Sequence, residues 1–263
     1  MTFLEAYLLT FPIVIGFLTL VWILSVFLKD VSLVDLVWGM TFVVAAWAHF
    51  FMTPQGWEVR KVLITGMYTL WGLRLSIYLT WRKIKQHKGE DYRYARMREG
   101  VGKNYWWVSL FSVFWSQGAV ASLLSVVSLA AQFQSEPRFL TIFDLVGVLV
   151  WGIGFYFESV SDWQLAKFKE NPNNKGKVLN TGLWALSRHP NYFGNAAMWW
   201  GYWLVAVSVH WGFLTAFAPA IMTFLLLRVS GVAMLERDIA ERRPQYAEYI
   251  RTVPAFFPRL PRR

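Results

Sequence analysis

The chain has 263 residues, of which 56% are hydrophobic and 18% aromatic, more than a water-soluble domain of ordinary composition carries. It has no cysteine, and its four histidines form no zinc-binding pair, so neither disulfides nor a metal site are expected. The net charge of +10 would suit nucleic acid, an anionic membrane face or an anionic ligand. The distribution of this charge along the chain favours an anionic membrane face and an anionic ligand. No nucleic-acid partner is expected.

Seven apolar stretches come close to the roughly 20 residues that a helix needs to cross a bilayer core. They cover residues 6–28, 33–52, 62–81, 107–131, 140–163, 192–209 and 213–236. No segment repeats and no linker is long enough to separate two domains, so we expect one domain over residues 1–263. The predicted fold is an all-α integral membrane protein with about seven transmembrane helices.

Basic residues outside these stretches gather on one side of the membrane if the helices alternate in direction. The loops after the first, third and fifth stretches and the carboxyl tail hold 21 of the 26 basic residues, whereas the opposite side holds only Arg60, Lys61 and Arg138. Because positive loops stay in the cytoplasm, the N-terminus is predicted outside and the C-terminus cytoplasmic.

Eight polar side chains fall in the cytoplasmic halves of the predicted helices, and the outer halves are almost purely apolar. They are Asp35, Arg74, Gln117, Glu158, Asp162, Asn195, Arg228 and Glu236. Buried ionisable groups are costly and persist where they pair or line a cavity, so their common depth predicts one polar chamber open to the cytoplasm. The alternative is a set of interhelical pairs, such as Arg74 with Asp35.

A basic run, QLAKFKENPNNKGK, follows Glu158 and Asp162, which lie four residues apart and therefore on one face of their helix. Lysines neutralise phosphates, carboxylates accept hydrogen bonds from ribose hydroxyls, and an Asn-Pro-Asn-Asn-Lys-Gly turn can fold over a ligand. The pattern is typical of a nucleotide site, and a positive-inside loop explains it equally well. No GxGxxG or GxxxxGK[ST] string occurs, which excludes a Rossmann or P-loop cradle.

A compact polar segment leads into the sixth stretch, and an amphipathic segment closes the chain. Arg188 and His189 can bind phosphate at a helix amino terminus, where free N–H groups and the dipole favour anions. The alternatives are membrane anchoring for Arg188 and a capping or core role for His189. Near the carboxyl end, Tyr246 and Tyr249 lie on a segment that we expect against the cytoplasmic membrane face.

Four segments resemble the bacterial membrane branch of the steroid 5-alpha-reductase family. They are GEDYRY (89–94), FESVSDWQLAKFK (157–169), TGLWALSRHPNYFG (181–194) and LERDIAERRPQYAEYIRTV (235–253). The resemblance implies a seven-helix reductase that binds NADPH from the cytosol within the bundle. It also implies that hydride passes to a carbon–carbon double bond conjugated to a ketone.

The same resemblance places residues at the cofactor. Asp162, Lys169, Lys177 and Asn191 fall where the family holds it, and Glu158 and Glu236 fall at further cofactor contacts. The expected cofactor-binding set also includes Tyr92, Arg93, Gln117, Asn174, Arg188, His189, Tyr192, Asn195, Tyr246, Tyr249 and Arg251.

For the substrate ketone, the family pairs a Glu near the start of helix two with a Tyr in helix three. The counterparts here are Asp35 and Trp71 or Tyr78 beside Arg74, so the resemblance implies Asp35, Arg74 and Tyr78 as catalytic residues. Asn195 stands where the steroid enzymes have Glu, which leaves the choice of substrate open.

A second resemblance, to isoprenylcysteine carboxyl methyltransferases, rests on RHPNYFG and the closing E…Y..Y..R pattern. It implies an S-adenosylmethionine-dependent membrane methyltransferase as the alternative function. The lysines of the basic run suit a phosphate-rich cofactor better than a sulfonium one, which favours the reductase. A transporter or lipid-binding scaffold would have polar residues in both membrane halves or an inverted repeat.

The expected activity is that of an NADPH-dependent oxidoreductase acting on a CH–CH group in lipid metabolism, like a 3-oxo-Δ4-steroid 5-alpha-reductase. The expected substrate is an apolar steroid-like or isoprenoid molecule that enters from the lipid, and a fatty enoyl group stays open. We expect a monomer in a bacterial inner membrane, with its cofactor site facing the cytoplasm.

Overall fold

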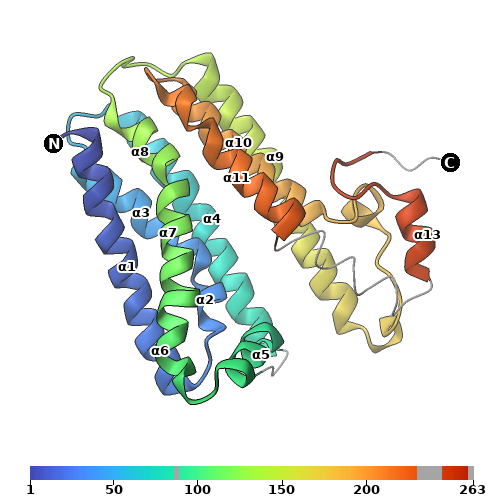
Figure 1. Ribbon diagram of the computed structural model, residues 1–263. Coiled ribbons are helices and arrows are strands. Elements are labelled where there is room, and N and C mark those ends of the chain that lie inside the picture. The colour runs from blue at the N-terminus through green and yellow to red at the C-terminus, as the bar shows by residue number, and fades with distance from the viewer. Residues whose placement is uncertain (86–88, 230–244, 260–263) are drawn as a thin grey trace. The chain divides into compact units, whose positions relative to one another are not determined.

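The computed structural model describes residues 1–85, 89–229 and 245–259 (Figure 1). All regular secondary structure in these residues is helical, as the composition predicts. The chain forms two compact units, one of Met1–Leu140 with Val209–Gly212 and one of Thr141–Ser208 with Phe213–Arg263. The single domain over residues 1–263 therefore stays a prediction.

The first unit is a helical bundle. Its elements are α1 (Phe3–Leu28), α2 (Leu33–Leu36), α3 (Trp38–Met52), α4 (Glu58–Lys85), α5 (Tyr92–Val101), η1 (Gly102–Asn104), α6 (Tyr105–Ser109), the π-helical turn η2 (Leu110–Trp115), α7 (Ser116–Leu124) and α8 (Val126–Phe133). α3 packs against α1 and α4, and α7 packs against α1. The apolar stretch predicted at 33–52 is thus divided into α2 and α3, and the one at 107–131 contains a π-helical turn.

Capping fixes where α1 begins. The Thr2 hydroxyl accepts the Glu5 N–H at 3.2 Å, and the Glu5 carboxylate accepts the Thr2 N–H at 2.7 Å, which forms a capping box. The helix ends at Leu28, and Lys29 follows as its C-cap with a left-handed backbone (φ 54°). Between these caps the surface is apolar on all sides, as in a membrane-spanning helix.

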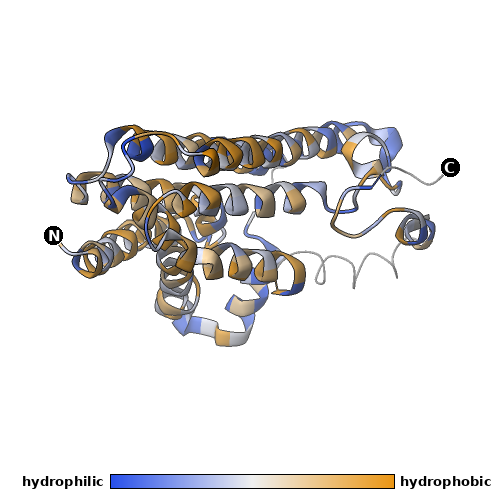
Figure 2. Ribbon diagram, turned by 90° about the horizontal axis from the view of Figure 1, so that it is seen from above, coloured by the Kyte–Doolittle hydropathy of each residue, from blue (hydrophilic) through white to orange (hydrophobic). Residues whose placement is uncertain are grey.

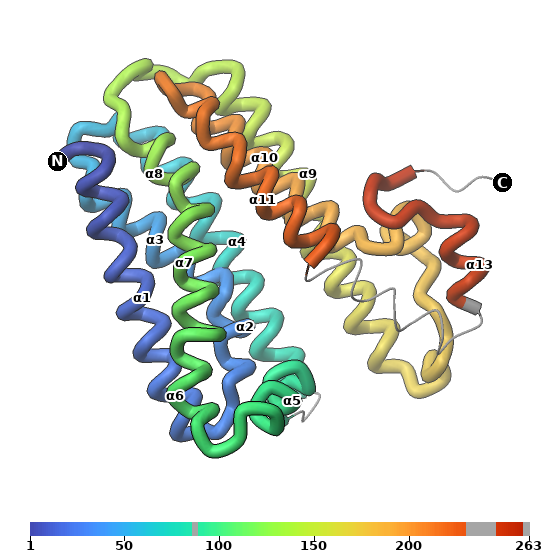
Figure 3. Tube along the Cα trace, viewed as in Figure 1, coloured from blue at the N-terminus to red at the C-terminus, as the bar shows by residue number. Residues whose placement is uncertain are grey.

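The second unit is built on two helices that lie side by side, α9 and α10 (Figure 3). Its elements are α9 (Ile142–Glu170), η3 (Pro172–Asn174), η4 (Gly182–Ala185), α10 (Pro190–Val207), α11 (Phe217–Phe224), the π-helical turn η6 (Leu225–Val229) and α13 (Gln245–Thr252). The turn η5 (Gly212–Ala216) precedes α11.

Glycines let α9 and α10 approach closely. A Cβ on Gly154 would lie 2.5 Å from the carbonyl oxygen of Gly194, and one on Gly147 would lie 2.8 Å from that of Gly201. Backbone contact of this kind is typical of membrane helices, where small residues permit close packing. We call this line of close contact between α9 and α10, at Gly147, Gly154, Gly194 and Gly201, the glycine seam. It runs toward the part of α9 that carries Glu158.

Five helical segments are long and apolar enough to cross a membrane, which supports an integral membrane protein. They are Phe3–Leu28, Glu58–Lys85, Tyr92–Phe133, Ile142–Glu170 and Gly212–Val229. Figure 2 shows hydrophobic residues along the long helices and hydrophilic ones mainly in the connections. The stretch predicted at 33–52 contains the shorter apolar helix Trp38–Met52, and the one at 192–209 corresponds to α10. Seven spans, and the side on which each terminus lies, stay predictions.

Polar side chains are also buried at the end of the first unit that the predicted orientation places outside. His49 and Arg60 are fully buried, and Lys61 is nearly so. The Arg60 guanidinium donates to the carbonyl oxygens of Pro137 and Phe139 at 3.2 and 3.0 Å. Arg60 and Lys61 lie outside the stretch predicted at 62–81 and inside α4, because α4 begins before the apolar run, and the predicted division of polar groups between the two membrane halves stays a prediction.

Candidate functional site

A carboxylate on α2 meets a tyrosine and an arginine on α5 in the first unit. The Tyr94 hydroxyl on α5 donates to Asp35 Oδ1 on α2 at 2.8 Å. Arg93 Nη2 donates to Asp35 Oδ2 at 2.6 Å, and Gln117 Nε2 on α7 donates to the Tyr94 hydroxyl at 3.5 Å. Tyr94 is buried and the Asp35 side chain is half-buried. This arrangement holds a phenol ready to donate a hydrogen bond or pass on a proton.

Ion pairs hold α5 in place beside α2. Asp91 is the N-cap of α5, where its carboxylate accepts hydrogen bonds from the backbone N–H and the Nε of Arg93 at 3.0 and 2.8 Å. The Glu90 carboxylate accepts the Val31 N–H at 2.8 Å and two N–H groups of Arg98 at 2.9 and 2.8 Å. The segment just before α2 is thus tied to α5.

Asp30 ties the same segment to α4. Its carboxylate pairs with the Lys83 ammonium and accepts hydrogen bonds from the backbone N–H and the hydroxyl of Ser32. Burial raises the pKa of Asp30, but the Lys83 and Ser32 hydrogen bonds and the Lys83 charge outweigh it, so the pKa lies below its usual value. Asp30 therefore stays ionised at neutral pH and helps to position α2.

The residues predicted to be catalytic lie on two helices, Asp35 on α2 and Arg74 and Tyr78 on α4. Among the described residues, Asp35 bonds to Arg93 and Tyr94 and not to Arg74 or Tyr78. The Arg74 guanidinium lies 5.3 Å from the centre of the Tyr78 ring, one helical turn along α4. Tyr94 is the hydroxyl beside the Asp35 carboxylate, and a catalytic role for Arg74 and Tyr78 stays a prediction.

Tyr94 lies within the GEDYRY segment, which is the signal that could have identified it. The spacing of residues along the apolar stretches could not have identified Tyr94, because Tyr94 lies on α5, a separate polar helix in the connection after α4.

In the second unit, two carboxylates on α9 face two amides on α10. Asn195 Nδ2 donates to Glu158 Oε2 at 3.3 Å, and Asn191 Nδ2 donates to Asp162 Oδ1 at 3.5 Å. Glu158 and Asp162 are 5% and 6% exposed. The glycine seam brings these helices close enough for short side chains to meet, so four predicted cofactor residues lie together.

The basic run, which begins in the last turns of α9, lines a pocket of about 350 Å³. Lys169, Lys175 and Lys177 line it together with Asn174, whose side-chain amide donates to the Phe168 carbonyl oxygen at 3.0 Å. Gly176 turns the chain with a φ of 85°, a conformation that favours glycine. Lysine ammonium groups around a small hollow fit a phosphate group, although not a whole dinucleotide.

Three other predicted cofactor residues have main-chain or core partners. Arg188 Nη1 donates to the carbonyl oxygens of Ile250 and Val253 at 2.9 and 2.7 Å, at the end of α13. The Tyr249 hydroxyl donates to a main-chain oxygen in η4. Tyr246 and Tyr249 are buried against neighbouring protein, and a position of their segment against the cytoplasmic membrane face stays a prediction.

The remaining predicted cofactor residues differ in their surroundings. The His189 and Tyr192 rings stack with centroids 5.5 Å apart, and His189 is buried at the start of α10. Tyr92 and Arg251 are exposed. Glu236 lies outside the described residues. A role for each of them at the cofactor stays a prediction.

The eight polar residues expected in one chamber divide between the two units. The first holds Asp35, Arg74 and Gln117, and the second holds Glu158, Asp162, Asn195 and Arg228. One chamber common to all of them stays a prediction.

Three known proteins are similar to this chain. An uncharacterised protein of Schizosaccharomyces pombe is 26% identical over 291 aligned positions, covering 99% of this chain and 83% of that protein. A probable O-methyltransferase of Ustilaginoidea virens is 32% identical over 95 positions, covering 32% of this chain and 33% of that protein. The 3-oxo-5-alpha-steroid 4-dehydrogenase 1 of Bos taurus is 32% identical over 99 positions, covering 37% and 34%.

No solved structure matches the chain. The family model described as "Protein of unknown function (DUF1295)" matches residues 21–253, which is most of the sequence. The chain therefore belongs to the DUF1295 family.

Proposed function

We propose that this chain is an NADPH-dependent membrane reductase that saturates the carbon–carbon double bond of an apolar enone. The observation that carries the proposal is the Tyr94 hydroxyl held between Asp35 and Gln117. Reduction of an enone needs a hydrogen-bond donor at the ketone oxygen, where negative charge develops. The partial similarity to a steroid 4-dehydrogenase supports the same class of reaction.

Tyr94 is the donor that would meet this oxygen. NADPH, when bound, supplies the hydride. With hydride delivered to the β-carbon, the electron pair of the double bond would move toward the ketone oxygen. The Tyr94 hydroxyl would donate its hydrogen bond to that oxygen in place of Asp35. Arg93 would balance the negative charge of the Asp35 carboxylate. The α-carbon would then take a proton from water, which yields the saturated ketone, and the hydroxide left behind would be neutralised by a proton from bulk solvent while Tyr94 keeps its own proton.

The second unit would hold the cofactor. Lys169, Lys175 and Lys177 would bind phosphate in their pocket. Glu158 and Asp162 have carboxylate oxygens that can accept hydrogen bonds from ribose hydroxyls. Their burial on α9 would orient the cofactor and exclude water from it.

A methyltransferase that uses S-adenosylmethionine is the second candidate. The similarity to a probable O-methyltransferase favours it. The lysine-lined pocket argues against it, because a sulfonium cofactor carries no phosphate and its positive sulfur would be repelled by lysines.

Thermal-shift titration of the detergent-purified chain with NADPH, NADH and S-adenosylmethionine tests the proposal, since a ligand that binds the folded state raises Tm. We expect NADPH to raise Tm and S-adenosylmethionine to leave it unchanged. Lys177→Ala should weaken NADPH binding about tenfold, or about 1.4 kcal/mol. Lys167→Ala removes a lysine that pairs with Glu170 and should bind NADPH normally.

Stabilisation by S-adenosylmethionine alone would make the methyltransferase the better assignment. Equal NADPH affinity in the two lysine variants would remove the lysine-lined pocket from the cofactor site.

A further inference from the structure

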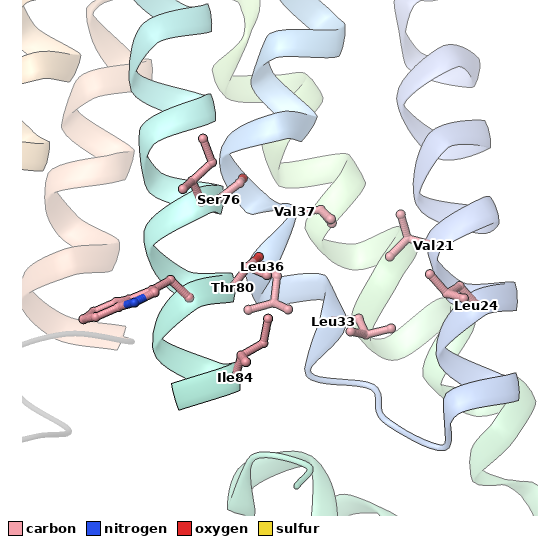
Figure 4. A pocket seen from close by; sticks show the side chains of 10 residues that line it. Val21, Leu24, Leu33, Leu36, Val37, Ser76, Thr80 and Ile84 are labelled. Atoms are coloured by element: carbon pink, nitrogen blue, oxygen red, sulfur yellow. The ribbon is translucent and has the colours of Figure 1, made fainter. Parts of the chain in front are cut away.

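Two hollows in the first unit differ in the charge of their walls. The larger, of about 580 Å³, lies between α1, α2 and α4, and no charged side chain lines it in the part of the chain that the structure describes (Figure 4). The smaller, of about 240 Å³, lies between the end of α1, α5 and α6. We call it the Lys29 pocket, and its lining residues are Ser25, Val26, Lys29, Val31, Arg98, Trp106 and Ser109. Its two cations give it a means of selecting a ligand.

The Arg98 guanidinium is fixed along one edge and keeps hydrogen-bond donors elsewhere. Its Nε and Nη2 atoms donate to the Glu90 carboxylate at 2.9 and 2.8 Å, and its Cζ lies 4.8 Å from the centre of the Tyr105 ring. Nη2 also donates to the Lys29 carbonyl oxygen at 3.5 Å, which places the guanidinium beside the end of α1. Nη1 has no hydrogen-bond partner among the described residues. It can therefore donate to a phosphate oxygen without first being ordered.

Lys29 supplies a positive charge that no carboxylate of this region balances. Its side chain is exposed and forms no ion pair with any described residue. Glu90 and Asp30 are the carboxylates whose charges act on Arg98. Glu90 pairs with Arg98 and Asp30 pairs with Lys83, so both are already neutralised. The pocket therefore attracts an anion.

The other polar groups of the wall are already engaged within the protein. The Ser25 and Ser109 hydroxyls donate to main-chain carbonyl oxygens at 2.7 and 3.0 Å. The Ser25 carbonyl oxygen accepts the N–H groups of Lys29 and Asp30, so the end of α1 does not present it to an anion. Recognition of a ligand therefore depends on Lys29 and Arg98.

The pocket lies where two candidate membrane spans have their ends. Phe3–Leu28 ends directly before Lys29, and Tyr92–Phe133 begins shortly before Arg98. Trp106, which lines the pocket, is exposed, and tryptophan is enriched where a membrane meets water. The ends of spanning helices lie at the level of the lipid headgroups. The anions present at that level in high local concentration are lipid phosphates.

We propose that the Lys29 pocket binds the headgroup phosphate of an anionic phospholipid. The Lys29 ammonium and Arg98 Nη1 donate to phosphate oxygens, and the acyl chains extend along the exposed apolar residues of α1. A zwitterionic phospholipid brings a cationic group for which the described residues of the pocket offer no unpaired carboxylate, so it binds more weakly. The observations that support this site do not depend on the reductase activity.

Native mass spectrometry of the full chain, released from micelles with equal amounts of phosphatidylglycerol and phosphatidylcholine of identical acyl chains, tests the site. We expect the wild type to retain phosphatidylglycerol about fivefold better. Lys29→Gln should lose most of this preference, and Lys29→Arg, which keeps the charge, should retain it. Lys103→Gln is the matched control, because it removes the same charge from an exposed lysine of η1 that does not line the pocket. It should keep the preference of the wild type.

A thermal-shift titration distinguishes a lipid phosphate from a soluble one. We expect phosphatidylglycerol to raise Tm of the wild type more than that of Lys29→Gln, and inorganic phosphate to act equally on both. A rise in Tm with inorganic phosphate that Lys29→Gln loses would make a soluble phosphate the ligand and overturn the lipid site.

Two results of the mass spectrometry would also overturn the site. One is equal retention of the two phospholipids by the wild type, and the other is an equal loss of preference in Lys29→Gln and Lys103→Gln. Tm of each variant without added lipid checks that it is folded.

Discussion

Tyr94 has its hydroxyl oriented from two sides, by the Asp35 carboxylate and by the Gln117 amide. A phenol held in this way does not have to be ordered when a substrate arrives, so more of its hydrogen-bond energy is available in the transition state. Arg93 occupies the other carboxylate oxygen of Asp35, which keeps that group in one orientation.

Tyr94→Phe should lower kcat for enone reduction about 100-fold, because it removes the donor to the ketone oxygen and little else. NADPH affinity should stay unchanged. Tyr156→Phe, at an exposed position on α9, is the matched control and should keep full activity. Steady-state kinetics with a 3-oxo-Δ4 steroid measure both. A kcat for Tyr94→Phe equal to that of the control would remove Tyr94 from the reaction.

Asp30 should make stability depend on pH. Its pKa is lowered in the folded protein, so its contribution is present above the usual value of about 3.9 and is lost as pH falls through the lower folded value. Asp30→Asn should therefore lower Tm at neutral pH, and the difference from wild type should shrink below about pH 4. Thermal unfolding across this pH range measures it, and a difference that does not change with pH would contradict the ionised pair with Lys83.

The sequence was enough to single out the charged residues that could form a site, but not to predict which groups they contact. Asp35, Glu158 and Asp162 are conspicuous because carboxylates are rare within apolar stretches. Arg188 is different, because its partners are main-chain carbonyl oxygens of a segment about sixty residues away, and no side-chain pattern marks them.

At the scale of helices, the α9–α10 seam positions the carboxylates of the second unit. Gly154 and Gly194 meet backbone to backbone, and Glu158 follows one turn later on α9. The distance between the helices therefore controls whether Asn195 reaches Glu158. Close packing is rigid, so an added methyl group has to be accommodated by movement of a helix.

Gly154→Ala should destabilise the protein by about 1–3 kcal/mol, since its methyl group would lie 2.5 Å from the Gly194 oxygen. Gly152→Ala is the control on the same helix, because a Cβ there meets nothing within 4 Å. It should be neutral or slightly stabilising, as alanine favours helix over glycine. Thermal unfolding of both variants in one detergent compares them, and equal Tm values would contradict the close seam.

Apolar length predicts the long helices well and the short ones poorly. The stretch 6–28 lies within α1, and the stretches 62–81 and 192–209 overlap α4 and α10. The helix α5 was not predicted, because it is short and polar and is held by its N-cap and ion pairs. The break between α2 and α3 was also not predicted, because mean hydropathy over a long window does not detect a change of helix direction within an apolar stretch.

At the scale of the whole molecule, five candidate spans support residence in a membrane. Apolar composition alone was enough to predict this, because no water-soluble fold exposes so much apolar surface. The positive charges indicate a cytoplasmic carboxyl terminus, and that orientation remains a prediction. A membrane location matches the proposed substrate, since an apolar enone is concentrated in lipid.

The transfer of deuterium from NADPH labelled at its hydride-donating position tests the proposed reductase most directly. The purified chain is incubated with the labelled cofactor and a 3-oxo-Δ4 steroid or an isoprenoid enone, and the product is examined by NMR. We expect deuterium at the β-carbon and a solvent proton at the α-carbon. Unreduced enones in every case, together with methylated product from S-adenosylmethionine, would contradict a reductase.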